Sequence, residues 1–259
     1  MTDPRPPHSY PGPAIVLGGS GGIGQAICRA LAADGLDVFL SYGARADVAR
    51  ALCEELRGQG VKAACAQARL DAPQDLAAFV EAGATFLGGI GVAVYAAGPP
   101  MRHSLVAQTS LQEWQRVAHA DLDGFFAFAS ACLPHLKQNE GGSLTAITTS
   151  ATGRPWSRYL LSAAPKVSIE MMVRLIAREE GRSGVRANCV APGMLDVGIG
   201  RAIMEESFDA ERLNLLLREI PLRKVGDAND VVEAVRFLAS NRAKYVSGQI
   251  LAVDGGMQA

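Results

Sequence analysis

The segment from Ser150 to Lys166, which reads SATGRPWSRYLLSAAPK, holds the side chains in this sequence that are best able to do chemistry. It offers a phenol at Tyr159, an ammonium group at Lys166 and hydroxyls at Ser150 and Ser162. Such groups can hydrogen-bond a substrate carbonyl oxygen or pass it a proton. We call Ser150–Lys166 the catalytic segment, and the rest of the chain must hold it against a bound molecule.

The spacing within the catalytic segment allows two local structures. Tyr159 precedes Lys166 by seven residues, and Ser162 precedes it by four. In a helix with about 100° per residue, positions seven apart share one face and lie two turns apart. If the helix begins only at Ser162, with Ser162 as N-cap and Pro165 in the first turn, Tyr159 lies on a loop instead.

Apolar runs alternate with amphipathic stretches along the whole chain. The expected strands cover residues 14–17, 37–42, 62–68, 91–98, 143–150, 186–193 and 249–256. The expected helices cover residues 23–35, 45–60, 73–88, 110–137, 162–180 and 227–239. This alternation predicts right-handed crossovers and a parallel sheet that is covered on both faces. The predicted fold class is therefore α/β, a three-layer doubly wound fold with a seven-stranded parallel sheet.

Length and composition favour one domain with one large core. The chain has 259 residues, of which 49% are hydrophobic. Five prolines fall within residues 1–13, which we expect to form a flexible N-terminal arm, with residues 14–259 as the single domain. Residues 194–220 fit no strand–helix unit and are a candidate lid over the substrate.

Charge, hydropathy and the cysteines and histidines indicate which partners, compartment and metal sites the sequence favours or excludes. With 25 basic and 26 acidic residues and no block of like charge, nothing points to nucleic acid or to an anionic membrane. No run of about 18 apolar residues could span a membrane, and no signal peptide is evident. The five cysteines fit reduced thiols in a cytoplasmic protein. Three scattered histidines (His103, His119 and His135) fit no metal spacing, and we expect surface or hydrogen-bonded side chains there.

A glycine-rich turn separates the first strand from the first helix. Gly18, Gly22 and Gly24 let the backbone turn tightly and approach a pyrophosphate, which the N–H groups at the start of the helix would bind. Ligands of such sheets bind beyond the carboxyl ends of the strands. At those ends lie Gly98, Ser150 and Pro192.

Several motifs in a fixed order now indicate a family. They are Gly18-x-x-x-Gly22-Ile23-Gly24, Ala97-Gly98, Lys166, Ala191-Pro192-Gly193, Ile220-Pro221-Leu222 and Val253-Asp254-Gly255-Gly256. In these motifs the chain resembles the short-chain dehydrogenase/reductase family over residues 14–256. The resemblance implies a single Rossmann-like domain, a nicotinamide dinucleotide cofactor and a homotetramer or dimer. It places cofactor contacts at Gly18, Ser20, Gly22, Ile23, Gly24, Ser41, Arg45, Leu70, Ala97, Gly98, Lys166, Pro192 and Gly193.

The end of the second strand indicates which dinucleotide is bound. A member that prefers NAD would carry an Asp or Glu there to bind the ribose hydroxyls. This chain has Ser41-Tyr42-Gly43-Ala44-Arg45 and no acid. The gap suits a 2′-phosphate with Ser41 and Arg45 as partners, so we expect NADPH rather than NADH. The alternative is a solvated Arg45 that only starts the second helix.

The resemblance also gives the catalytic segment its expected roles. Common reductases of the family use a Ser and a Tyr-x-x-x-Lys motif, in which the phenol gives a proton and the ammonium lowers its pKa and binds the ribose. Here Ser162 stands in the tyrosine position, whereas the seven-residue spacing of Tyr159 and Lys166 resembles the enoyl-acyl-carrier-protein reductase branch. We expect Ser150, Tyr159 and Lys166 to be catalytic, with Thr149 as the alternative to Ser150 if the register differs by one residue, and we expect no metal.

Other departures from the family pattern keep three functions open. They are Leu17, Arg69, Tyr95, Ala96 and Asp121, the last in place of a catalytic asparagine. The favoured interpretation is an NADPH-dependent oxidoreductase of an enoyl or oxoacyl thioester, or a similar carbonyl compound, in fatty acid or polyketide biosynthesis. The substrate would be a small molecule or an acyl group on acyl carrier protein. The alternatives are a ketoreductase or alcohol dehydrogenase with a displaced acid, and a catalytically silent nucleotide-binding protein.

Overall fold

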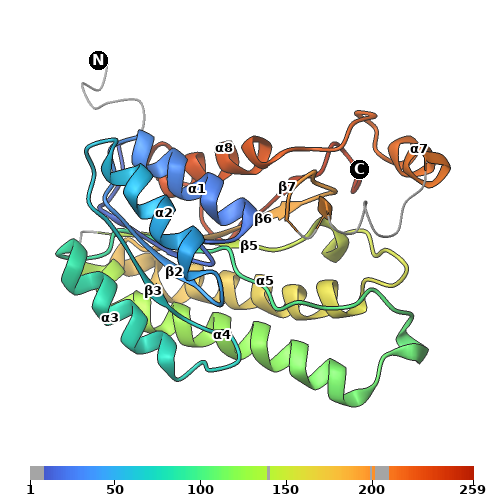
Figure 1. The fold of residues 1–259 in the computed structure, drawn as a ribbon, viewed down its shortest axis with the longest axis horizontal. Helices are drawn as coiled ribbons and strands as arrows, with labels where there is room; N and C mark the ends of the chain where they lie inside the picture. Colours follow the sequence, from blue (N-terminus) through green and yellow to red (C-terminus); the bar gives the residue numbers. More distant parts are fainter. Residues whose placement is uncertain (1–8, 139–140, 199, 202–209) are drawn as a thin grey trace.

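The computed structural model describes residues 9–138, 141–198, 200–201 and 210–259. Residues 1–8 of the expected arm, and residues 199 and 202–209 of the expected lid, lie outside the described residues. A single parallel sheet runs through the molecule in the order β3-β2-β1-β4-β5-β6-β7 (Figure 1). Its strands are β1 (Ala14–Leu17), β2 (Val38–Tyr42), β3 (Ala63–Gln67), β4 (Val92–Tyr95), β5 (Ser143–Ile147), β6 (Arg186–Pro192) and β7 (Ile250–Val253).

Helices cover both faces of the sheet, which confirms the three-layer, doubly wound fold (Figure 1). One layer holds α1 (Gly22–Ala33), α2 (Ala46–Arg57) and α8 (Ala228–Ala239). The other holds α3 (Asp75–Leu87), α4 (Leu111–Gln138) and α5 (Leu160–Glu180). A further helix, α7 (Ala210–Glu219), lies at the end of the molecule that also holds the C-terminus.

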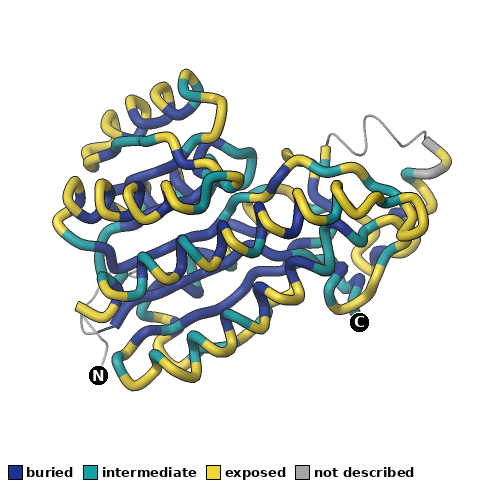
Figure 2. Tube along the Cα trace, turned by 90° about the horizontal axis from the view of Figure 1, so that it is seen from below, coloured by how far each residue is buried: buried dark blue, intermediate teal, exposed yellow. Residues whose placement is uncertain are grey.

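The buried strands alternate their side chains between the two layers. In β1, Ala14 and Val16 pack in the layer of α1, α2 and α8, whereas Ile15 and Leu17 pack in the layer of α3, α4 and α5. Because both faces are covered, such a strand is a continuous apolar run rather than an alternation of apolar and polar residues. Figure 2 shows this buried sheet between helices whose outer faces are exposed.

Two helices begin at side chains that accept hydrogen bonds from the first free N–H groups. Asp227 accepts hydrogen bonds from the N–H groups of Asn229 and Asp230 and closes a capping box at the start of α8. Ser110 Oγ accepts from the Glu113 N–H at 3.1 Å, directly before α4. These side chains fix where the two helices begin.

The start of α5 differs from the expectation of a helix that begins at Ser162. The helix begins at Leu160 with Tyr159 as its N-cap, so the prediction that Ser162 is the N-cap is wrong. The Ala163 N–H donates to the Tyr159 carbonyl at 2.8 Å, so the first turn closes three residues earlier than it would with Ser162 as N-cap. Just before it, Arg158 has a positive φ of 71°, a conformation that non-glycine residues rarely adopt.

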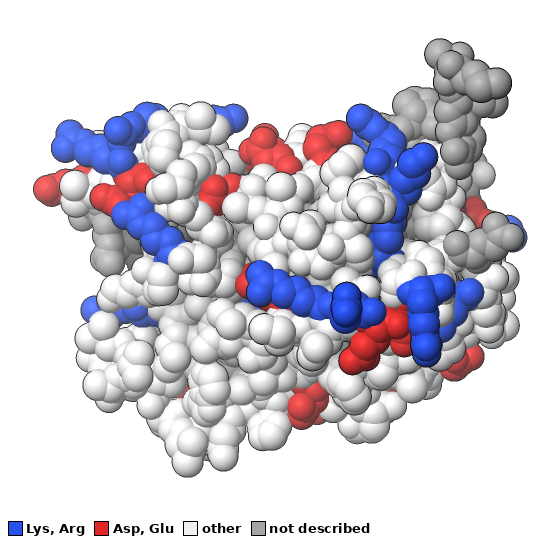
Figure 3. Space-filling model, turned by 180° about the vertical axis from the view of Figure 1, so that it is seen from behind, with Lys and Arg blue, Asp and Glu red and all other residues white. Residues whose placement is uncertain are grey.

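Basic and acidic side chains are mixed on the surface. On the face shown in Figure 3, Lys and Arg are interspersed with Asp and Glu over a largely uncharged surface. Within the part of the chain that the structure describes, no helix has both the length and the apolar character needed to cross a membrane.

Candidate active site

A cleft of about 1180 Å³ lies where β1, β4, β5 and β6 end. The β1–β4 boundary is the point where the strand order reverses, and ligands of doubly wound sheets bind there. Every site residue predicted from the sequence lines this cleft except Gly24. The predicted residues that line it are Gly18, Ser20, Gly22, Ile23, Ser41, Arg45, Leu70, Ala97, Gly98, Ser150, Tyr159, Lys166, Pro192 and Gly193.

Gly24 does not line the cleft but packs against the backbone of the glycine turn. A Cβ at this position would lie 2.1 Å from the Gly18 carbonyl oxygen, so only glycine lets helix α1 approach the turn. Gly18 itself has a positive φ of 86°. The N-cap of α1, Gly21, places no side chain over the first N–H groups. The positive end of α1 therefore faces the cleft, and this arrangement fits the diphosphate of a dinucleotide.

Two polar side chains from β2 and the start of α2 reach the glycine turn. Ser41 Oγ accepts a hydrogen bond from the Gly18 N–H at 2.7 Å, and its own O–H stays available to donate. Arg45 Nη2 donates to the Ser20 carbonyl at 2.6 Å. Arg45 thus bonds across the turn, and it also remains exposed to solvent and forms the N-cap of α2. A hydroxyl and a guanidinium here fit an additional phosphate better than a ribose diol.

Strand β5 delivers the start of the catalytic segment to the cleft. Ser150 opens a short 3₁₀ turn directly after the strand and is buried. Thr149 is the N-cap of this turn, since its Oγ1 accepts from the Ala151 N–H at 3.3 Å. The Thr149 hydroxyl accepts this bond and, like that of Ser41, keeps its own O–H to donate, so both Thr149 and Ser150 bring hydroxyls to the cleft.

Tyr159 lies in the wall of the cleft between two other rings. Its ring centroid is 4.6 Å from that of His103 and 5.7 Å from that of Trp156. A parallel bridge with Ser104 ties its backbone to the segment that follows β4. Burial raises the pKa of the Tyr159 phenol above its ordinary value. The phenol is therefore neutral at physiological pH and can donate a hydrogen bond, without the lowered pKa that the family resemblance implies.

Lys166 forms an ion pair inside the protein. Its Nζ donates to Asp121 Oδ1 at 2.8 Å, and the two side chains are 9% and 0% exposed. Tyr95 O–H donates to the same carboxylate oxygen at 3.0 Å, and Lys166 Nζ lies 5.1 Å from the centre of the Tyr95 ring. Two departures from the family pattern, Tyr95 and Asp121, therefore contact each other and the lysine. We call Tyr95, Asp121 and Lys166 the buried network.

His103 lines the cleft, a position that the sequence analysis did not predict. Its ring is hydrogen-bonded to the Arg158 backbone, whereas its Nε2 is buried without a partner among the described residues. Burial lowers the pKa of its imidazole, against a hydrogen bond with the Arg158 backbone that raises it. Its position just after the fourth strand was the available signal, because the segments after central strands border the cleft.

His119 and His135 each pair with a carboxylate. His119 pairs with Asp123 at the surface, and His135, whose side chain is 15% exposed, pairs with Glu81. All five cysteines are free thiols. The described residues contain no group of three or more side chains that could hold a metal ion.

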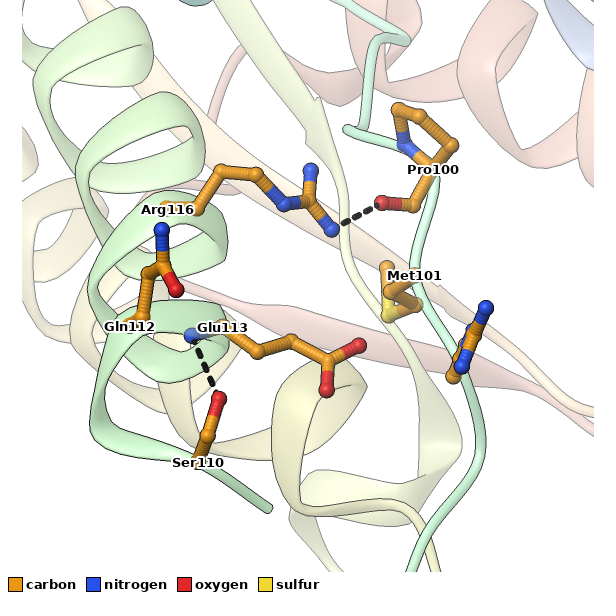
Figure 4. A pocket seen from close by; sticks show the side chains of 7 residues that line it. Pro100, Met101, Ser110, Gln112, Glu113 and Arg116 are labelled. Carbon is orange, nitrogen blue, oxygen red and sulfur yellow. Dashed lines mark hydrogen bonds between the residues drawn. The ribbon is translucent and has the colours of Figure 1, made fainter.

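Apolar residues close the cleft toward α7. Met194 and Met257 pack with Leu216 and Ile220, and Trp156 lies against this cluster. The predicted lid (194–220) therefore contributes side chains to an apolar region that includes cleft residues. A smaller cavity of about 540 Å³ adjoins the cleft and shares Pro100, Met101 and Arg116 with it (Figure 4).

The sequence matches one family model and many characterised proteins. A family model described as enoyl-(acyl carrier protein) reductase matches residues 18–258. The 3-oxoacyl-(acyl-carrier-protein) reductase FabG of Staphylococcus epidermidis is 30% identical over 246 residues, which are 94% of this chain and 98% of that protein. The 3beta-hydroxysteroid dehydrogenase 1 of Eggerthella lenta is 32% identical over 244 residues, with 94% and 92% covered.

Solved structures show the same fold. A blue fluorescent protein from a metagenomic library, in complex with NADPH, is 32% identical with a TM-score of 0.87, and the match covers 96% of this chain and 98% of that one. A short-chain type dehydrogenase/reductase from Mycobacterium ulcerans has a TM-score of 0.90 at 24% identity, with 97% and 91% covered. At that identity the second likeness concerns the fold alone.

Proposed function

The chain belongs to the short-chain dehydrogenase/reductase family, whose members bind a nicotinamide cofactor, and we propose that it is an NADPH-dependent reductase of an enoyl or oxoacyl thioester or a similar carbonyl compound. What supports this most is that one cleft is lined both by the glycine turn and by the catalytic segment. A dinucleotide bound on the turn would extend toward Ser150, Tyr159 and Lys166.

The residues along the cleft fit this cofactor. The glycine turn and the uncapped start of α1 would hold its diphosphate, and Ser41 with Arg45 would hold the 2′-phosphate that distinguishes NADPH from NADH. Lys166 would bind the nicotinamide ribose, beside Pro192 and Gly193. When bound, the cofactor supplies the hydride. Between the glycine turn and Lys166, apolar and backbone contacts to the cofactor would come from Ile23, Leu70, Ala97 and Gly98, which line the cleft.

The protein's own part in the reaction is to bind and protonate the substrate oxygen. Ser150 would hydrogen-bond this oxygen, and Tyr159 would donate a second hydrogen bond or a proton to it. A neutral, half-buried phenol is suited to stabilise the enolate oxygen that forms when a conjugated C=C bond is reduced. Together with the seven-residue spacing to Lys166, this favours an enoyl substrate over a keto substrate.

A ketoreductase or alcohol dehydrogenase is the second candidate. Ser162 lines the cleft in the first turn of α5, four residues before Lys166, where the family places its tyrosine. Its short hydroxyl could act through a water molecule, or Tyr159 could move to replace it. FabG, whose name describes a 3-oxoacyl reductase, is among the relatives that support this reading.

We further propose a cytoplasmic homotetramer or dimer in which residues 14–259 form one domain. Val167, Met171 and Leu175 recur at four-residue intervals on α5 and are about half exposed. Phe126 on the neighbouring α4 is also exposed. An apolar stripe of this kind on two packed helices suits burial against another copy of the chain.

The test is NADPH oxidation followed by absorbance, with a crotonyl-type and an acetoacetyl-type thioester as paired substrates. The wild type is compared with Tyr159→Phe and Ser162→Ala. Turnover of the enoyl substrate that depends on Tyr159 supports the favoured function. Turnover of the keto substrate that depends on Ser162 supports the second candidate. If NADPH binds and a broad substrate panel gives no turnover, the protein is a silent nucleotide-binding member of the family.

A further inference from the structure

The buried network joins three elements directly behind the cleft. Lys166 comes from α5 and lines the cleft, whereas Asp121 from α4 is fully buried behind it. Tyr95, at the end of β4, donates a hydrogen bond to the Asp121 carboxylate. The second carboxylate oxygen, Oδ2, is buried and has no hydrogen-bond partner among the described residues. A carboxylate in this position is therefore held mainly by its ion pair with Lys166.

The ion pair changes the charge that the cleft presents. Lys166 beside a neutral amide would leave one uncompensated positive charge at the end of the cleft. With Asp121 in contact at 2.8 Å, the pair has a net charge of zero. Solvent screens this difference weakly because both side chains are almost completely buried.

We propose that Asp121 tunes the preference of the site for the two oxidation states of the cofactor. The oxidised nicotinamide ring is cationic and the reduced ring is neutral. An uncompensated Lys166 would repel only the oxidised form, and Asp121 removes this repulsion. Asp121 thereby raises the affinity for the oxidised cofactor relative to the reduced one. This inference rests on the proposed function, which places the nicotinamide half of the cofactor beside Lys166.

The direct test is the ratio of the dissociation constants of NADP⁺ and NADPH, measured by equilibrium titration without substrate. Asp121→Asn keeps the size of the side chain and leaves Lys166 uncompensated. Two unit charges about 10 Å apart in a protein with an effective dielectric constant of about 20 interact strongly enough to change a binding constant roughly tenfold. We therefore expect the NADP⁺/NADPH ratio of dissociation constants to rise about tenfold. The NAD⁺/NADH ratio should rise equally, since the 2′-phosphate plays no part.

Two control variants separate charge from structure. Asp123→Asn removes a carboxylate on the same helix whose side chain is 55% exposed and pairs with His119, so the ratio should not change. Tyr95→Phe removes the hydrogen bond to Asp121 but no charge. It should leave the ratio unchanged even if both affinities fall. A ratio that moves as far in Tyr95→Phe as in Asp121→Asn would overturn the inference.

A double variant keeps the test decisive if Asp121→Asn does not fold. Asp121→Asn combined with Lys166→Gln has no net charge, so its ratio should match that of the wild type. Lys166→Gln alone keeps the negative charge of Asp121, whereas the double variant lacks it. The difference between their NADP⁺/NADPH ratios of dissociation constants therefore measures the effect of that charge, and equal ratios in the two variants would overturn the inference. If the wild type binds neither dinucleotide, the proposed function fails first, which is a distinguishable result.

Discussion

Replacing Gly24 by alanine tests whether the glycine turn has the geometry on which the cofactor site depends. The added Cβ would lie 2.1 Å from the Gly18 carbonyl oxygen and 2.8 Å from the Gly18 carbonyl carbon. Both are backbone atoms, which cannot move aside as a side chain can. Either α1 must withdraw or the turn must open. Overpacking of this kind costs about 1–3 kcal/mol, and we expect about 3 kcal/mol because no rotamer change can relieve the contact.

Thermal unfolding and NADPH titration measure the two consequences of Gly24→Ala. At roughly 2–4 °C per kcal/mol for a domain near this size, the melting temperature should fall by about 6–12 °C. NADPH affinity should fall by more than tenfold, because the glycine turn and the N–H groups at the start of α1 would no longer be positioned to bind the diphosphate together. Gly43→Ala is the matched control, since Gly43 also lines the cleft but a Cβ there meets nothing within 4 Å. A Gly24→Ala protein with wild-type melting and NADPH binding would refute this reasoning.

Three further predictions concern residues outside the glycine turn. Because burial lowers the pKa of His103, the unfolded chain takes up this proton at higher pH than the folded one, so stability should be lost as the pH falls below about 6.5. His103→Phe should reduce that loss in urea unfolding at pH 7.5 and 5.5, and an unchanged pH dependence would contradict the assignment. Arg236→Ala removes the guanidinium that pairs with Asp34, which keeps its hydrogen bond from the Tyr10 hydroxyl, and should cost about 2 kcal/mol in urea unfolding, where a loss below about 0.5 kcal/mol would be inconsistent. Cys65 is half-buried and the other cysteines are buried, so Cys65→Ser should abolish the fast phase of thiol labelling of the native protein; a fast phase that persists would show the opposite.

Features that depend on local chemistry were predictable from the sequence. Strand β1 ends where the expected apolar run ends, because the glycines that follow stop the strand and open the turn. Ser41 and Arg45 were identified by the absence of an acid after the second strand, and both contact the turn. Asp227 caps α8 as its residue type predicts.

Features that depend on tertiary packing were not predictable. Tyr95 and Asp121 could each be recognised as a departure from the family pattern, but their contact with Lys166 results from the packing of β4, α4 and α5. Serine is a stronger N-cap than tyrosine, yet α5 begins after Tyr159. The bridge between Ser104 and Tyr159 fixes the chain there, so a tertiary contact overrides the local preference.

The most direct test of the account is the NADPH oxidation rate with a crotonyl-type thioester, measured for the wild type and for Tyr159→Phe. Removing the phenol that donates to the substrate oxygen should lower the rate by about 10²- to 10⁴-fold, the range typical of a general acid, while NADPH binding is retained. A Tyr159→Phe protein that turns over this substrate at the wild-type rate would contradict the account.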